Sequence, residues 1–412
     1  MKRSYLYTLL FCSLLMGGCI DEYEANLPSS DETRLVVEGN IRSDMLCTFY
    51  LSYSVGLNGI IGWGEGYVPN IGFASMGAAP VVTDARLSVI GEDGTVFPDV
   101  NNGLYAPSGM YQVEVGTLRP NVRYWLRIET GGDVFTTDPQ FPLYSESEVS
   151  LSFEQVRSDQ DVDIMVTPAA PGDNQKRFYR WDYTEYWEVL TPYKAEFEYD
   201  PASNTIVKAA TLKNHGWCTS NSVNAKMANS SDFQENHIVG LPTVSIPHTD
   251  NRFSSKYHLR VYQRCISQQE YEYEMLRYKL SNKMGGLFSP MPADLPTNIR
   301  CESGNRKAIG FVGVSGQVAT ATITISSSDV NYERRRVPSQ INHKSLEPAS
   351  CRQLYYSGLR LVSFNNDDPH FQGDGPFDAD SAPDKKWAER WCVDCTDPYW
   401  NASLKKPKDW PE

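Results

Sequence analysis

The strongest constraint on the fold of this chain is a series of short β-branched and aromatic runs separated by turn residues. Residues 35–41 and 48–53 are early examples. Residues 85–90 alternate apolar and polar side chains, reach a glycine-containing turn at 91–94 and continue at 95–97, which predicts a hairpin. The 24 Tyr, 25 Pro and 29 Gly among 412 residues fit short strands and many turns better than long helices, so we expect a mainly β protein.

The most specific local signal lies in residues 118–128. Leu118, Pro120 and Tyr124 have the Leu-x-Pro-x-x-x-Tyr spacing, which resembles the tyrosine corner of fibronectin type III and immunoglobulin-like sandwiches. In that corner the tyrosine hydroxyl hydrogen-bonds to the backbone of the preceding turn. Because a final strand is expected at 134–137, the pattern predicts one immunoglobulin-like β-sandwich over residues 33–143.

A larger β-rich domain is predicted over residues 144–350. Its most prominent segment is the run 178–189, in which a period of two places aromatic side chains on both faces. We interpret this run as a central strand covered on both sides. An exposed aromatic platform for stacking sugars is the alternative. Further strands are expected at 205–212, 256–263, 307–314 and 317–326.

One helix is predicted in this domain, over residues 267–284. Ser267 and Glu270 have the spacing of a capping box, in which the serine side chain accepts from the backbone and the glutamate reaches back. Tyr271 and Met275 recur at helical spacing, and Gly285 follows the last turn. We expect this helix to pack on the sheet as core structure.

The last segment, residues 351–412, is rich in proline and charge and is predicted to be irregular. Cys392 and Cys395 form a lone C-x-x-C, without the second pair of a zinc knuckle or the strand–helix context of a thioredoxin-like site. We therefore expect a disulfide from Cys351 to Cys392 or Cys395 that ties this segment down. Seven cysteines follow Cys19, so at least one thiol stays free.

Composition and motifs exclude several functional classes. The formal net charge is −13 and no domain is basic, which argues against nucleic acid as a partner. The chain has neither the H-x-x-x-H spacing of a metalloprotease helix nor a G-x-S-x-G elbow, so we expect a non-catalytic protein and assign no catalytic residue. The acidic stretch 365–384 is expected to be a solvated loop. Ca²⁺ binding there is the alternative, although the spacing of the acidic residues matches no EF-hand loop. No other cofactor or metal is expected.

A glycine-rich segment at 56–77 interleaves Trp63, Tyr67 and Phe73 among seven glycines. Such a density of glycine costs chain entropy unless something orders the segment. A surface loop is one interpretation. The other is an aromatic-tipped loop whose three rings contact a partner protein or a sugar.

The first nineteen residues have the pattern of an export signal. Lys2 and Arg3 precede an apolar stretch at 6–16, which as a helix would span about 16 Å of a hydrocarbon core of about 30 Å. This predicts a signal peptide over residues 1–18 instead of a membrane span. Small residues before Cys19 resemble a bacterial lipobox, in which the cysteine thiol is lipidated. A secreted protein with a chance cysteine is the alternative.

Residues 19–32 form a polar, acidic tether that resembles the export signal for the outer face of the outer membrane in Bacteroidota-type cells. A linker without a sorting role is the alternative. The chain as a whole resembles a family of Bacteroidota outer-membrane lipoproteins that carry a domain of unknown function and are commonly encoded beside SusC/SusD-type TonB-dependent import systems. The segments that carry this resemblance are Cys19 with its tether, residues 35–39, 217–218, 267–288, 296–299 and 308–311, and the tail 392–410.

The resemblance implies a lipid-anchored, surface-exposed accessory protein of a nutrient-import system. Its partners would be the outer membrane, a SusC/SusD-type transporter pair, and a glycan or peptide ligand. The family has no catalytic residues to transfer to this sequence. Two alternatives stay open: a glycan- or peptide-processing enzyme with an unrecognised site, and a structural or adhesion protein of the envelope.

Overall fold

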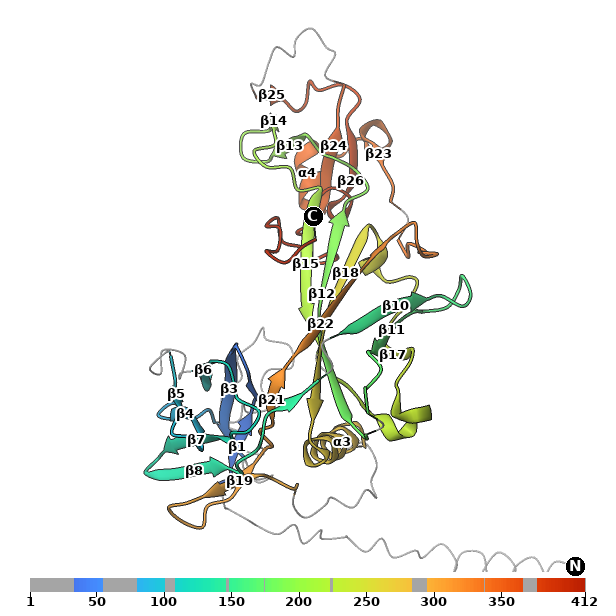
Figure 1. The fold of residues 1–412 in the computed structure, drawn as a ribbon. Helices are drawn as coiled ribbons and strands as arrows, with labels where there is room; N and C mark the ends of the chain where they lie inside the picture. The colour runs from blue at the N-terminus through green and yellow to red at the C-terminus, as the bar shows by residue number, and fades with distance from the viewer. Residues whose placement is uncertain are drawn as a thin grey trace, which may run out of the picture.

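The computed structural model describes residues 33–54, 80–100, 108–145, 148–173, 175–222, 225–283, 295–336, 338–365 and 376–411. The protein is mainly β, as the sequence predicts, and is built of an N-terminal sandwich, a central pair of sheets and a smaller lobe (Figure 1). Within these ranges no helix is long and apolar enough to cross a membrane.

The N-terminal sandwich consists of two facing sheets. The strands of the first sheet, in spatial order, are β20 (Ala308–Ile309), β1 (Leu35–Glu38), β3 (Met45–Tyr53) and β6 (Met110–Val115). The strands of the second sheet are β19 (Ile299–Cys301), β8 (Asp133–Thr137), β7 (Tyr124–Thr130), β4 (Arg86–Gly91) and β5 (Val96–Pro98). The hairpin expected at 85–97 is confirmed, since β4 and β5 pair antiparallel.

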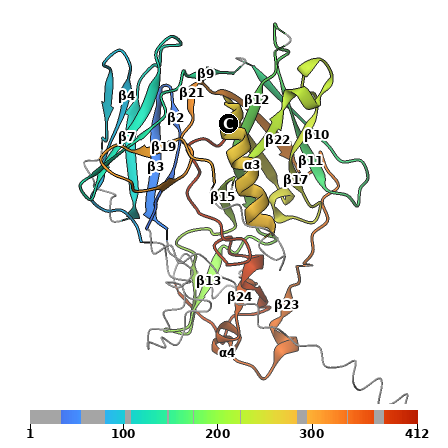
Figure 2. The ribbon, with the colours of Figure 1, turned by 90° about the horizontal axis from the view of Figure 1, so that it is seen from below.

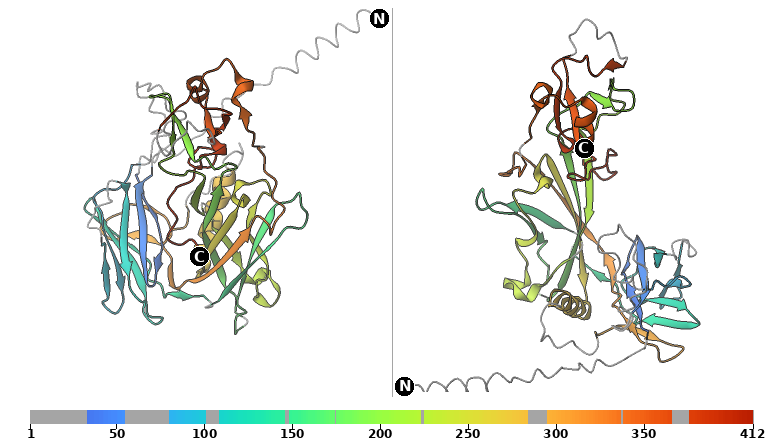
Figure 3. Two further views of the ribbon diagram at one scale, coloured as in Figure 1. Left: turned by 90° about the horizontal axis from the view of Figure 1, so that it is seen from above. Right: turned by 180° about the vertical axis from the view of Figure 1, so that it is seen from behind.

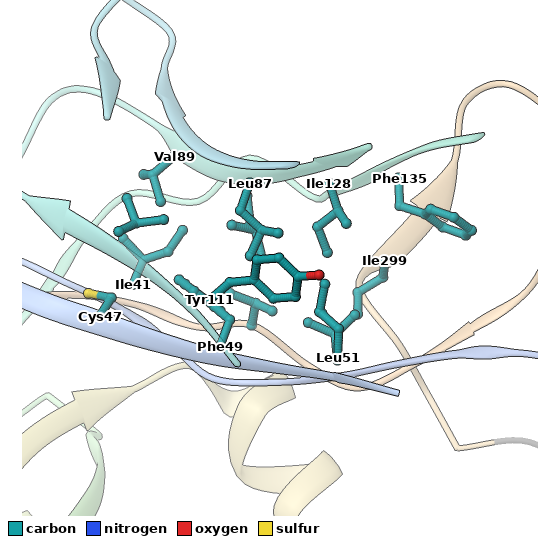
Figure 4. Close-up of a cluster of buried hydrophobic side chains, with 14 of the residues drawn as sticks. Ile41, Cys47, Phe49, Leu51, Leu87, Val89, Tyr111, Ile128, Phe135 and Ile299 are labelled. Carbon is teal, nitrogen blue, oxygen red and sulfur yellow. The ribbon is translucent and has the colours of Figure 1, made fainter. Parts of the chain in front are cut away.

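The core of this sandwich is almost purely apolar. Alternate side chains of β7, including Leu126 and Ile128, are buried in the same core as Phe49 and Leu51 of β3. Figure 4 shows Ile128, Phe49 and Leu51 in this core. The tyrosine corner is also confirmed, because the backbone N–H of Arg119 donates to the Tyr124 hydroxyl at 3.0 Å. The hairpin and the corner are therefore both predicted correctly by local sequence signals.

Two strands of the sandwich come from much later in the chain than the predicted boundary at 143. Ile299 of β19 pairs antiparallel with Thr137, and Ala308 of β20 pairs parallel with Leu35. A further small sheet joins β2 (Ile41–Arg42), β21 (Val314–Gln317) and β9 (Leu143–Tyr144). Short strands such as these carry no local pattern that names a distant partner, so the stretch 33–143 describes the sandwich incompletely.

The central region pairs a larger sheet with a smaller one. The larger sheet has the order β15 (His215–Asn221), β12 (Phe178–Leu190), β18 (Lys256–Ile266) and β22 (Ala319–Ser326), with β16 (Lys226–Asn229) also paired to β12. The smaller sheet contains β10 (Val149–Glu154), β11 (Val162–Pro168) and β17 (Leu241–Ile246). The short 3-10 segments of this region are η2 (Ser230–Asp232), η3 (Gln234–Asn236) and η4 (Asn251–Phe253).

The prediction of a central aromatic strand is confirmed. Strand β12 has neighbours on both edges, and its Tyr179 and Trp181 are buried in the core between the two sheets. On the other face, the Phe178 ring lies 5.0 Å from the ring of Tyr271, and Tyr186 is also buried. Most of the run is core structure on both sides, with Tyr183 and Trp187 half-buried, which disfavours a platform of several exposed rings.

Helix α3 (Gln268–Lys283) lies at the lower end of β12 and β18 (Figures 1 and 2). The backbone N–H of Glu270 donates to Ser267 Oγ at 3.0 Å, so half of the expected capping box is present. The Glu270 carboxylate does not reach back as expected, because it lies 3.0 Å from Nη1 of the buried Arg264. The helix is therefore tied to the sheet by a charge as well as by aromatic contacts.

The buried charges form a network where α3 meets the sheet. Arg180 contacts Asp182 at 3.1 Å and Glu274 at 3.0 Å, and Arg264 lies 3.7 Å from Asp182. Burial raises the pKa of Glu270, although the nearby guanidinium groups oppose this shift. We call Arg180, Asp182, Arg264, Glu270 and Glu274 the junction network.

The smaller lobe, at the top of Figure 1, corrects the prediction that residues 351–412 are irregular. Its elements are β13 (Phe197–Asp200), β14 (Thr205–Lys208), β23 (Ile341–Asn342), η5 (His343–Leu346), α4 (Cys351–Tyr356), β24 (Leu359–Ser363), β25 (Phe377–Asp378), β26 (Lys386–Glu389) and η6 (Arg390–Cys392). Strand β25 pairs with β14, so this lobe joins two distant parts of the chain (Figure 3). Burial of Trp387 and the neighbouring apolar side chains stabilises the structure of this segment.

The predicted disulfide is wrong, because Cys351, Cys392 and Cys395 are all free thiols. Cys351 lies in the core of the lobe and donates to the carbonyl of Ala379 at 3.7 Å. Cys392 and Cys395 belong to a different core, which they share with Cys218. These cysteines pack as small apolar side chains, and burial raises the pKa of both Cys218 and Cys395 to about 11.

Candidate ligand-binding cavity

An open cavity of about 630 Å³ lies between the larger central sheet and the C-terminal segment. Five separate stretches of the chain line it: β12, β15, the turn that leads into η4, residues 335–336 and residues 399–400. The lining side chains are Glu185, Trp187, Ser220, Pro247, Thr249, Asp250, Asn251, Arg252, Arg335, Arg336, Tyr399 and Trp400. Its volume is within the range of about 300–1,000 Å³ that is typical of small-ligand sites.

Both acidic side chains of the cavity are held by one arginine. Arg252 contacts the two carboxylate oxygens of Asp250 at 3.2 and 3.1 Å through Nε and Nη2, and its Nη1 donates to Glu185 at 2.6 Å. Glu185 also accepts from the hydroxyl of the buried Tyr257 at 2.8 Å. Charge-assisted hydrogen bonds of this kind are short and strongly oriented, so these side chains form a rigid floor.

The protonation state of this floor follows from the same contacts. Burial alone would raise the pKa of Asp250, but hydrogen bonds and charge from Arg252, together with the charge of Arg335, outweigh burial and lower it. The same two acids raise the pKa of Arg252 above its usual value, against the effect of burial. Asp250 is therefore a carboxylate at neutral pH, which suits binding better than proton donation.

A neighbouring Ser–Glu–His cluster does not have the order of a nucleophile and its base. His215 Nε2 lies 2.8 Å from one oxygen of Glu188, and Ser255 donates to the other oxygen at 2.6 Å. The carboxylate stands between the serine and the histidine, whereas a nucleophilic serine needs the histidine as its direct partner. This cluster therefore provides no activated hydroxyl.

One wall of the cavity is aromatic and cationic. The Arg336 guanidinium carbon lies 5.1 Å from the ring centroid of Tyr399 and 5.6 Å from that of Trp391. The Tyr399 and Trp400 rings are 4.8 Å apart, and the Tyr399 hydroxyl donates to Asn251 Oδ1 at 3.2 Å. These contacts hold the wall in one arrangement.

The cavity carries a positive balance in an acidic protein. Three arginines and two carboxylates line it, a formal charge of +1, whereas the whole chain carries −13. Arg335 and Arg336 are both exposed, and Arg335 Nε donates to Thr249 Oγ1 at 2.9 Å. The site can therefore attract an anion while its aromatic groups contact an apolar surface.

None of the site residues predicted from the sequence lies in this cavity. Cys351, Cys392 and Cys395 are in neighbouring cores, while Cys19, Trp63, Tyr67 and Phe73 lie outside the described residues, as do residues 366–375 of the acidic stretch. Among the described residues, no group of three or more metal-ligating side chains gathers. Two sequence signals could have marked the cavity: the arginine run 334–336 and the pair Tyr399 and Trp400.

Comparison with known proteins gives a family and no activity. The family model of a domain of unknown function, DUF4249, matches residues 20–321. The chain belongs to this family. No curated protein matches it. Among solved structures, a segment of two fibronectin type III domains from chicken tenascin is similar, with 12% identity, a TM-score of 0.15, and coverage of 57% of this chain and 91% of that one.

The DUF4249 match includes only part of the cavity. Glu185, Trp187 and Arg252 lie within the matched residues 20–321, whereas Arg335, Arg336, Tyr399 and Trp400 follow them. In this DUF4249 chain, residues that follow the matched region thus supply the cationic and aromatic wall, while the floor is built from the matched region.

Proposed function

We propose that this DUF4249 protein is a lipid-anchored, surface-exposed accessory protein of a SusC/SusD-type nutrient-import system in the outer membrane of a Bacteroidota-type cell. Its task is to bind the incoming ligand, a glycan or a peptide, without chemically changing it. The observation that carries the proposal is the cavity, where both lining carboxylates are engaged by Arg252 while aromatic and cationic side chains form much of the remaining lining.

The location is proposed from the N-terminal sequence. Lys2 and Arg3 precede an apolar stretch, and Gly17 and Gly18 precede Cys19, which fits cleavage and acylation at that cysteine. Each buried CH₂ contributes about 0.8 kcal/mol, and one myristoyl chain alone gives only marginal binding. Two or three acyl chains on Cys19 would hold the protein at the membrane.

The test of location compares two cysteine variants in the native cell. Cys19→Ala is expected to move the protein from the membrane fraction to the soluble fraction, and mass spectrometry of the wild-type protein is expected to find acyl chains on residue 19. Cys12→Ala is the matched control, because that cysteine lies in the segment that is removed. Mature wild-type protein that begins elsewhere, or that stays soluble, would contradict the anchor.

The test of the role is a detergent pull-down from native membranes together with protease treatment of whole cells. We expect a TonB-dependent transporter and its SusD-type partner to co-purify, and the protein to be cleaved on intact cells. A protein that is protected from the protease, while a known surface lipoprotein is cleaved, would contradict surface exposure. Turnover of glycans or peptides by the purified protein would favour the enzyme alternative instead.

A further inference from the structure

We infer that the cavity binds an acidic oligosaccharide, with a sugar carboxylate held by Arg335 and Arg336 and a sugar ring stacked on Trp187. This inference rests on the proposed ligand-binding function and deepens it by naming the ligand class. Three features of the cavity carry it: exposed cations, a tryptophan ring without a ring partner, and a set of short polar side chains.

The exposed cations are Arg335 and Arg336. Arg252 is fully engaged by Asp250 and Glu185, and so contributes no free charge. Among the described residues no carboxylate lies within ion-pair distance of Arg335, whose contact with Thr249 uses only Nε. The nearest acid to Arg336 is Glu389, at 3.9 Å, and the oxygen of that pair already accepts from the Trp391 indole.

Arg336 is oriented before any ligand arrives. Its guanidinium lies over both Tyr399 and Trp391, which limits its rotamers while leaving the edge of the group for hydrogen bonds. A planar guanidinium matches a carboxylate in a bidentate geometry. The expected ligand group is therefore a carboxylate that enters from the open side of the cavity.

The unstacked ring is Trp187 of β12. Unlike Tyr399 and Trp400, which pack on each other, Trp187 makes no ring contact within the described part of the chain, and its side chain is only half-buried. An indole face at the wall of an open cavity is suited to the apolar face of a pyranose ring. Trp187 packs in part against two core clusters, and the part of its side chain that remains exposed at the cavity provides the stacking surface.

The remaining lining groups favour a carbohydrate over a peptide. Ser220, Thr249 and Asn251 offer hydroxyl and amide groups, and Asn251 Oδ1 is taken by two tyrosine hydroxyls while its Nδ2 has no partner among the described residues. A peptide would instead pair with a free strand edge. The edge of β15 is already bridged by the chain itself, because Trp217 and Ser403 exchange backbone hydrogen bonds at 2.8 Å.

The test is isothermal titration of the full-length protein in detergent with defined oligosaccharides. We expect binding of uronic-acid oligomers, such as oligogalacturonate or alginate fragments, and at least tenfold weaker binding of neutral malto-oligosaccharides. The double variant Arg335→Ala/Arg336→Ala should lose at least tenfold in affinity for the acidic ligand, as should Trp187→Ala. Arg157→Ala/Arg300→Ala is the matched control, since it removes the same charge at two exposed sites outside the cavity.

The outcomes separate this inference from the proposed function. Equal affinity for neutral and acidic oligomers, an unaffected Arg335→Ala/Arg336→Ala variant, or binding of acidic peptides in place of sugars would overturn the ligand class. None of these results would move the protein from the membrane or from its transporter. Conversely, loss of the anchor in the cysteine experiment would overturn the location and leave the titration unchanged.

Discussion

The N-terminal sandwich and the junction network are both buried, but they are built from opposite materials. In the sandwich, the core is apolar apart from groups such as the Tyr111 hydroxyl, which donates to Val82 at 2.9 Å and accepts from Ala85. In the junction network, Arg264 is 2% exposed and faces carboxylates from β12 and α3. The sandwich is stabilised by burial of apolar surface. The junction network is stable only when each buried charge has its oppositely charged partner.

The difference teaches how each region specifies its geometry. Apolar side chains tolerate exchange for others of similar volume, whereas a buried charge without its partner is strongly destabilising. The junction also fixes position, because Arg264 Nη1 reaches Ser315 of β21 at 3.4 Å and a side chain at Gly313 would lie 1.9 Å from a Glu270 oxygen. It therefore aligns α3, the central sheet and the segment that returns to the sandwich.

The largest expected effect comes from removing one member of the junction. Arg264→Met should lower the free energy of unfolding by roughly 3–5 kcal/mol, because it leaves the buried Glu270 without its nearest cation. Urea denaturation followed by fluorescence measures this change. The control is Arg260→Met on the same strand, which loses only a partly exposed pair with Asp409 and should cost within about 1 kcal/mol.

A cavity in the sandwich core should cost almost as much without involving charge. Leu126→Ala removes a fully buried side chain of β7, and we expect a loss of roughly 2–5 kcal/mol. The loss should be the same at low and high salt, unlike that of an ionic variant. Leu46→Ala, at a position 48% exposed on the same sandwich, should change stability by no more than about 0.5 kcal/mol. Equal losses in both leucine variants would refute the assigned core.

The tyrosine corner supplies a smaller test within the sandwich. Tyr124→Phe keeps the ring but removes the acceptor for the Arg119 N–H, so stability should fall by about 1 kcal/mol. Thermal unfolding by calorimetry measures this difference. A variant as stable as wild type would show that the hydroxyl does not hold the corner.

The smallest expected effect is a pH dependence of stability that arises in the junction network and not in the apolar core of the sandwich. Because the pKa of Glu270 is raised in the folded protein, its contribution to stability is present below 4.5, the ordinary value, and is lost as pH rises through the folded pKa. The stability of wild type relative to Glu270→Gln should therefore fall as pH rises above 4.5. Denaturation of both proteins over a pH series checks this, with Leu126→Ala as a control that keeps the wild-type pH dependence.

Sequence reasoning succeeded where the signal and its partner are close in the chain. Tyr124 and Arg119 are five residues apart, the hairpin of β4 and β5 spans one turn, and Ser267 caps the helix that follows it. The aromatic run of β12 also predicts a strand covered on both faces, because large aromatic side chains on both faces of a strand are usually buried.

It failed where a residue has more than one available partner. Glu270 has the spacing of a capping box, yet burial beside Arg264 decides its contact. The predicted disulfide from Cys351 to Cys392 or Cys395 is wrong because Cys351 lies in one core and the other two cysteines lie in another. The cavity needs five chain segments to meet, and only tertiary packing brings Arg336 over Tyr399.

The strands β19 and β20 also set an order of events for the growing chain. Synthesis proceeds from the N-terminus, so β1 and β8 exist long before residues 299–309 can pair with them. Until then both strands present unpaired edges, which are templates for aggregation, and the long loop that must close slows folding. A fragment that stops before residue 299 would keep those edges permanently, so this sandwich is a unit of architecture but not an autonomous folding unit.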